Sequence, residues 1–134
     1  MLQYVLDTNI CIYIAKQRPP EVQEKFSTLS VGSVGMSLVT YGELLYGAYR
    51  SQNTEKARDI LDELVTLIPV IPVAQAVAQH YAEIRADLAS KGKLIGNNDL
   101  WIAAHVRSLN KTLVTNNLKE FERVAGLTIE NWCH

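Results

Sequence analysis

The stretch YVLDTN at residues 4–9 joins a short apolar run to an acidic turn. The apolar residues from Gln3 to Leu6 predict a β-strand. The polar residues Asp7-Thr8-Asn9 then have the composition of a turn or a helix cap, and the apolar segment from Ile10 to Ala15 predicts a short helix. A strand that leads directly into a helix is the opening unit of an alternating β/α fold.

The same alternation continues along the chain. Further strands are predicted at Val34 to Val39, at Thr112 to Thr115 and, as edge strands, at Leu67 to Val73, which contains Pro69 and Pro72, and at Thr128 to Ile129. Helices are predicted at Val22 to Leu29, around Ala57 to Leu64, from Val77 to Leu88 with Gly92 beyond its end, from Leu100 to about Leu109, and from Leu118 to Val124. We therefore expect one α/β domain over residues 1–134, with a central, mainly parallel sheet of about five strands flanked by helices.

The bulk composition restricts the class of protein. With 48% hydrophobic and 20% charged residues among 134, the chain is expected to fold as one globular domain. Its net charge of −1 means that a nucleic-acid substrate would need a local basic patch or a bound metal. The chain shows no secretory leader pattern and no apolar run near the roughly 20 residues that cross a bilayer. We accordingly expect a cytoplasmic protein whose Cys11 and Cys133 are reduced thiols.

Acidic residues follow several of the predicted strands. Asp7 comes directly after the first strand, Glu43 follows the second, Asp99 opens the Leu100 helix, and Glu120 follows the Thr112–Thr115 strand. Because ligands of open α/β sheets bind beyond the carboxyl ends of the strands, we expect these acids to meet at one edge of the sheet.

Each acid also has a purely structural explanation. Asp7 is suited to cap the following helix, Thr40 to Glu43 matches a capping box, and Asp99 suits the positive end of a helix dipole. If the acids meet at one place, however, a binding site is the better interpretation, because three or four adjacent carboxylates repel one another unless a cation lies among them. A set of oxygen ligands favours Mg²⁺ or Mn²⁺, either of which supports phosphodiester hydrolysis.

Four segments of the chain, in order, resemble the PIN-domain toxins called VapC. They are Tyr4 to Asn9, Thr40 to Gly47, Ile95 to Ala104 and Leu113 to Phe121, and the similarity runs from residue 4 to the C-terminus. The resemblance implies a PIN-like fold and a metal-dependent endoribonuclease toxin of a type II toxin–antitoxin pair. It also implies that Asp7, Glu43 and Asp99 are catalytic, metal-binding acids.

The fourth acidic position departs from the family pattern. Many members have an aspartate where this chain has Asn117, and an amide does not supply a full negative charge to a metal. Glu120, one helical turn later, is the acid that we expect to substitute. Asn117, Thr115 and Asn9 are then candidates for orienting the carboxylates or for contacting substrate. Lys91, Lys93 and Lys119 are candidates for holding RNA phosphates.

The resemblance also implies partners. They are a cognate VapB antitoxin, a VapC homodimer that joins the antitoxin in a larger hetero-oligomer, and operator DNA bound only through the antitoxin. The segments Thr115 to Asn117, Glu120 to Arg123 and Asn131 to Cys133 resemble an enterobacterial-type subgroup. That subgroup is associated with cleavage of initiator tRNA in the anticodon stem-loop, where unstacked loop bases are open to recognition.

Two other interpretations remain open at this stage. A phosphoaspartyl phosphatase would need a second aspartate where Asn9 stands. A catalytically weak module that binds RNA or protein on a PIN scaffold is favoured only by Asn117. Metal-dependent RNA cleavage separates the nuclease from the binding module. His80, His105 and His134 are too scattered for a nucleophilic triad or a zinc site.

Overall fold

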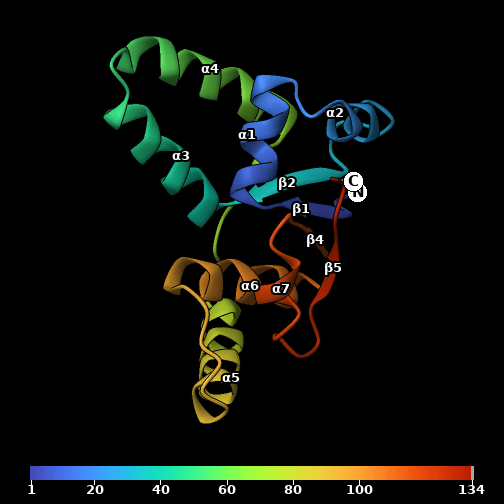
Figure 1. Ribbon diagram of the computed structural model, residues 1–134, viewed down its shortest axis with the longest axis vertical. Coiled ribbons are helices and arrows are strands. Elements are labelled where there is room, and N and C mark those ends of the chain that lie inside the picture. Colours follow the sequence, from blue (N-terminus) through green and yellow to red (C-terminus); the bar gives the residue numbers. More distant parts are fainter. Residues whose placement is uncertain (134) are drawn as a thin grey trace.

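A five-stranded parallel sheet forms the centre of the protein, which is described here from a computed structural model covering residues 1–133 (Figure 1). His134 lies outside the described residues. The strands are β1 (Tyr4–Leu6), β2 (Val34–Ser37), β3 (Val70–Ile71), β4 (Thr112–Val114) and β5 (Thr128–Glu130). Their order in the sheet is β3-β2-β1-β4-β5, and every pairing is parallel. The sheet predicted as mainly parallel is thus parallel throughout the described chain.

Helices cover both faces of this sheet. They are α1 (Thr8–Lys16), α2 (Pro20–Ser27), α3 (Leu38–Arg50), α4 (Thr54–Leu67), α5 (Ala76–Ser90), α6 (Asn97–Leu109) and α7 (Leu118–Phe121). Figure 1 shows α1 to α4 on one side of the strands and α5 to α7 on the other. Within residues 1–133, no helix is long and apolar enough to span a membrane.

The alternation of side chains along β1 joins two separate parts of the core. Tyr4 and Leu6 pack into a cluster with α1, α2 and α4, whereas Val5 packs into a second cluster with α5 and α6. Successive residues of a strand point to opposite faces of its sheet, so a strand covered on both faces is apolar at every position. This burial is why β1 is a continuous apolar run.

The path of the chain creates a crevice beside β1. After β1 the chain adds β2 and β3 outward on one side, and it then returns to add β4 and β5 on the other. A reversal of this kind leaves an opening at the carboxyl ends of the two strands that flank it. Here those strands are β1 and β4, which lead into Asp7 and Thr115.

The second strand ends earlier than predicted. Ser37 rather than Thr40 caps the following helix, because its Oγ accepts a hydrogen bond of 3.1 Å from the Val39 N–H. Leu38 and Val39 therefore belong to α3, and the prediction of a strand as far as Val39 is wrong. The capping box from Thr40 to Glu43 is wrong too, because both residues lie within the helix and Glu43 is beyond its first turn.

Two local predictions about the ends of elements are confirmed. The segment with Pro69 and Pro72 forms the edge strand β3, flanked by those two prolines. Gly92 follows α5 with a φ of +66°, a left-handed conformation that glycine adopts without a steric penalty.

Candidate active site

Asp7 lies at the junction of β1 and α1 and is almost fully buried. Its Oδ1 accepts a 2.8 Å hydrogen bond from the Thr8 N–H, so it is the N-cap of α1. Its Oδ2 accepts a second bond of 2.8 Å from the Thr115 hydroxyl, which follows β4. Burial raises the pKa of Asp7, the bonds from Thr115 and Thr8 oppose that rise, and the negative charge of Glu43 adds to it. The carboxylate is therefore held at the crevice between β1 and β4.

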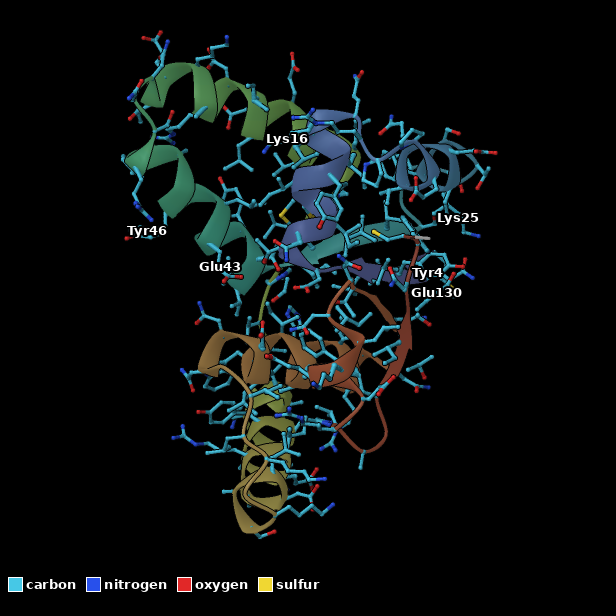
Figure 2. The ribbon with its side chains drawn as sticks, viewed as in Figure 1. Tyr4, Lys16, Lys25, Glu43, Tyr46 and Glu130 are labelled. Carbon is cyan, nitrogen blue, oxygen red and sulfur yellow. The ribbon has the colours of Figure 1, made fainter. Side chains whose placement is uncertain are left out.

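Glu43 reaches the same region from α3. Figure 2 shows it on α3, nearer the sheet than Tyr46 of the same helix. Its Oε1 accepts a 2.6 Å hydrogen bond from the Thr8 hydroxyl, and its Oε2 accepts a longer one of 3.4 Å from the Asn98 amide. Thr8 Oγ1 also lies 3.2 Å from the Thr40 hydroxyl, which is buried beneath it. Thr8 therefore connects Asp7, through its N–H, to Glu43, through its hydroxyl.

Asp99 stands in the first turn of α6 and is half-buried. Its pKa is raised to about 6, first by burial and then by the negative charges of Asp7, Glu120 and Glu43. A hydrogen bond between the Asp99 and Glu120 side chains contributes in the same direction. Four acids from four elements of the fold therefore interact at one place.

The chemistry of these ligands fits a hard divalent cation, because every candidate ligand atom is a carboxylate oxygen. The geometry, however, is not a preformed cage. Among residues 1–133, the His, Cys, Asp and Glu side chains form no group of three that could hold a metal ion as they stand. Thr8 and Asn98 hold Glu43 in its present position. A metal ion shared by three of these acids would therefore need their carboxylates to lie closer together than they do here.

Of the two candidates for the fourth position, Glu120 is the one whose charge acts on Asp99. It contributes to the raised pKa of Asp99, whereas Asn117 donates its backbone N–H to Thr115 Oγ1 over 2.9 Å. Asn117 therefore supports the threonine that holds Asp7. Asn9 is exposed on α1 and, in the part of the chain described, forms no hydrogen bond with any of the four acids.

Comparison with known proteins gives the family of the chain. The PIN domain family matches residues 4–127. The chain belongs to that family. It is 45% identical to the tRNA(fMet)-specific endonuclease VapC of Shigella flexneri and 43% identical to ribonuclease VapC2 of Haemophilus influenzae. Each alignment covers 98% of this chain and 99% of the relative.

Solved structures of the PIN family extend the similarity to three dimensions. A structure of DNA-bound VapBC from Salmonella typhimurium has a TM-score of 0.93 and 38% identity, and the alignment covers 99% of this chain and 100% of that one. VapBC-1 from nontypeable Haemophilus influenzae has a TM-score of 0.90 and 41% identity, over 98% of both chains. The resemblance to VapC is thereby confirmed over practically the whole chain.

The three lysines proposed as RNA contacts differ in their surroundings. Lys93 and Lys119 line one cleft between the α5–α6 turn and α7. Lys91 instead pairs with Asp87 on α5, with 3.1 Å between Nζ and Oδ1. The structure thus separates Lys91 from the other two.

Sequence reasoning overlooked three residues of this PIN-domain site: Thr8, Thr40 and Asn98. Thr8 and Asn98 each adjoin a predicted acid in the sequence, and this adjacency was the only available signal. The Trp101 ring stacks on Tyr81, with centroids 3.8 Å apart.

Proposed function

We propose that this PIN-domain protein is a metal-dependent endoribonuclease, the toxin of a VapBC pair, which inhibits translation by cutting initiator tRNA in its anticodon stem-loop. The observation that carries the proposal is the convergence of Asp7, Glu43 and Glu120 on Asp99, whose pKa is raised to about 6 by burial and by the charges of the other three acids. Acids that repel one another in this way cost stability unless they serve a ligand. The choice of substrate is supported by relatives named as tRNA(fMet)-specific endonucleases in Shigella flexneri and Salmonella typhimurium.

In this proposal Asp7, Glu43 and Asp99 would hold Mg²⁺ or Mn²⁺, and Glu120 completes the acidic set. A bound cation of this type activates water and stabilises charge on the phosphate oxygens. Thr115 and the Thr8 N–H keep the Asp7 carboxylate in place, and the Thr8 hydroxyl and Asn98 orient Glu43. Because their hydrogen bonds leave other lone pairs of each carboxylate available, these contacts are compatible with a cation.

The proposed partners follow from the neighbours of known structure. Those from Salmonella typhimurium, Rickettsia felis and Haemophilus influenzae are VapBC complexes, two of them with DNA. We therefore assign this chain a cognate VapB antitoxin, a homodimer within a larger hetero-oligomer, and operator DNA bound through the antitoxin. The tRNA substrate places its action in the cytoplasm.

The test is cleavage of an initiator tRNA transcript by the full chain, freed of antitoxin. We expect one cut in the anticodon stem-loop in the presence of Mg²⁺ or Mn²⁺, none in EDTA, and little cutting of an elongator tRNA. Asp99→Asn is the better inactive variant, because both Asp7 oxygens have structural roles. We expect this change to reduce cleavage by at least about 100-fold, the scale of losing an electrostatic group at a reacting centre.

Two outcomes would contradict the nuclease. Cleavage by Asp99→Asn at the wild-type rate would exclude the assigned acids. Tight binding of RNA with no metal-dependent cleavage would instead identify a binding module built on the PIN scaffold.

A further inference from the structure

A basic cleft is formed by segments that neighbour two of the acids in the sequence, the turn before α6 and the chain around α7. It has a volume of about 490 Å³ and lies between the turn that follows α5 and the chain around α7. Its lining residues are Gly92, Lys93, Leu94, Lys119, Glu122 and Arg123. Three cations thus face one carboxylate, in a chain whose net charge is −1.

Two of these cations are available to bind a ligand. Lys93 and Lys119 are exposed, and neither forms an ion pair with another residue in the range 1–133. Two other basic residues are already engaged, Lys91 with Asp87 and Arg107 with Glu83. Unpaired ammonium groups on opposite walls of a cleft attract anions.

The third cation has a different role. Nη1 of Arg123 donates to the backbone carbonyls of Lys93, at 3.4 Å, and Leu94, at 3.3 Å. It therefore links the segment after α7 to the α5–α6 turn and keeps the two walls together. Its positive charge remains at the cleft while it does so.

Both walls of the cleft continue along the chain into the acids. Lys119 directly precedes Glu120, whose negative charge helps to raise the pKa of Asp99. The turn with Lys93 continues into α6, whose first turn contains Asp99. A polyanion at the acids is repelled by four carboxylates, so adjacent cations are needed to hold its neighbouring phosphates.

We propose that this cleft binds the RNA backbone beside the scissile phosphate, with Lys93 and Lys119 each contacting a phosphate group. The inference rests on the proposed nuclease function and adds the path of the substrate away from the acids. An acidic protein segment would also pair with the two lysines, but it would have no use for a catalytic acid nearby in the chain.

The experiment measures RNA affinity in EDTA as a function of salt, using a single-stranded oligonucleotide with the anticodon-loop sequence. The slope of log K against log[salt] is negative, and for single strands each lost phosphate contact reduces its size by about 0.7. We expect the double variant Lys93→Gln, Lys119→Gln to reduce the size of that slope by about 1.4, with affinity at least several-fold weaker at low salt. Lys91→Gln, whose lysine is paired with Asp87, is the matched control and should leave both values unchanged.

Binding in EDTA separates this inference from the proposed activity. If the wild-type protein fails to cut RNA but the slope falls as expected, the cleft assignment stands and the nuclease proposal fails. If the slope of the double variant equals that of the wild type, or Lys91→Gln lowers it equally, the cleft assignment is overturned. Cleavage kinetics give a second readout. Without antitoxin, the double variant should still cut RNA with an unchanged kcat but a raised KM, because these contacts hold substrate and transition state alike.

Discussion

Asp99 carries a charge that the fold opposes. Its carboxyl group is half-buried near three other acids, so its pKa is about 6 in the folded protein against an ordinary value of 3.8. A carboxyl group whose pKa is higher in the folded than in the unfolded state lowers stability as the pH rises above the unfolded value. The loss grows between pH 3.8 and about 6 and is constant above that.

Replacing that charge should therefore stabilise the metal-free protein. At pH 7.5 in EDTA we expect Asp99→Asn to raise the free energy of unfolding by about 1 kcal/mol after solvent screening, which is a few degrees in Tm. At pH 4.5 the two proteins should differ much less. Thermal melts at both pH values measure this. Equal melting temperatures at pH 7.5 would mean that neither burial nor the neighbouring acids make the Asp99 charge costly.

The identity of the fourth acid is also a prediction at the scale of single residues. The charge of Glu120 helps to raise the pKa of Asp99, whereas the Asn117 N–H donates to Thr115 Oγ1. We expect Glu120→Gln to slow metal-dependent cleavage by about tenfold or more, and Asn117→Ala to slow it less. Cleavage rates at saturating Mg²⁺ measure the order. If Asn117→Ala is the more damaging change, the fourth position belongs to Asn117.

At the scale of elements, the junction of β2 with α3 and β3 depends on close contacts. Ser37 ends the strand by capping α3, and its hydroxyl also lies 2.7 Å from Nδ1 of the buried His105. Two residues earlier, Gly35 leaves room for β3. A Cβ at this position would lie 2.8 Å from Ile71 Cδ1 and 3.1 Å from the Pro69 carbonyl oxygen. That carbonyl accepts the Met36 N–H, so β3 cannot move away without weakening the ladder.

A single methyl group therefore tests this junction. Gly35→Ala should lower the free energy of unfolding by about 1–3 kcal/mol, the usual cost of overpacking. Gly47→Ala, on the exposed face of α3 with nothing within 4 Å of the new Cβ, should raise it by about 0.5–1 kcal/mol. Urea unfolding gives both values. Similar shifts in the same direction would mean that the contact with Ile71 and Pro69 is not tight.

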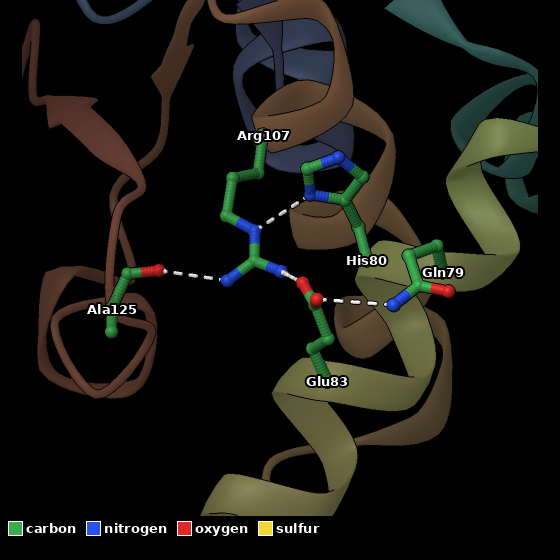
Figure 3. Close-up of polar contacts among 5 residues, drawn as sticks. All are labelled: Gln79, His80, Glu83, Arg107 and Ala125. Atoms are coloured by element: carbon green, nitrogen blue, oxygen red, sulfur yellow. Dashed lines mark hydrogen bonds and ion pairs between the residues drawn. The ribbon is translucent and has the colours of Figure 1, made fainter.

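At the scale of the whole molecule, Arg107 joins three segments of the half formed by α5 to α7. From α6 its Nε donates to His80 Nδ1 on α5 over 2.8 Å, and its Nη1 donates to the Ala125 carbonyl over 3.1 Å (Figure 3). Its Nη2 pairs with Glu83, which also accepts a hydrogen bond from Gln79. The guanidinium thereby connects α5 and α6 to the segment that leads into β5.

Removing this connection should be costly. We expect Arg107→Ala to lower the free energy of unfolding by about 1–3 kcal/mol through its lost bonds to His80 and Ala125. Lys91→Ala, which removes an exposed pair with Asp87, should change it by no more than about 0.5 kcal/mol. Guanidinium unfolding distinguishes the two. Equal effects would show that Arg107 contributes no more than a surface ion pair.

The sequence by itself determined the features that depend on neighbouring residues. The apolar run before Asp7, the prolines of β3, the glycine after α5 and the periodic helices each have a local signal, because side-chain period and chain termination act over a few residues. These signals were sufficient for the sheet and for placing Asp7, Glu43 and Asp99 after their strands or at a helix start.

Only the tertiary structure decided what those acids contact. Thr115 and Asp7 are 108 residues apart, and Asn98 and Glu43 are 55 apart, yet each pair is hydrogen-bonded. The i,i+4 spacing of Asp87 and Lys91 is a local signal for that pair, but only the tertiary structure brings Lys93 to the same cleft as Lys119. The raised pKa of Asp99 arises in the same way, because burial and the charges of distant acids exist only once β1, α3, α6 and α7 have packed together.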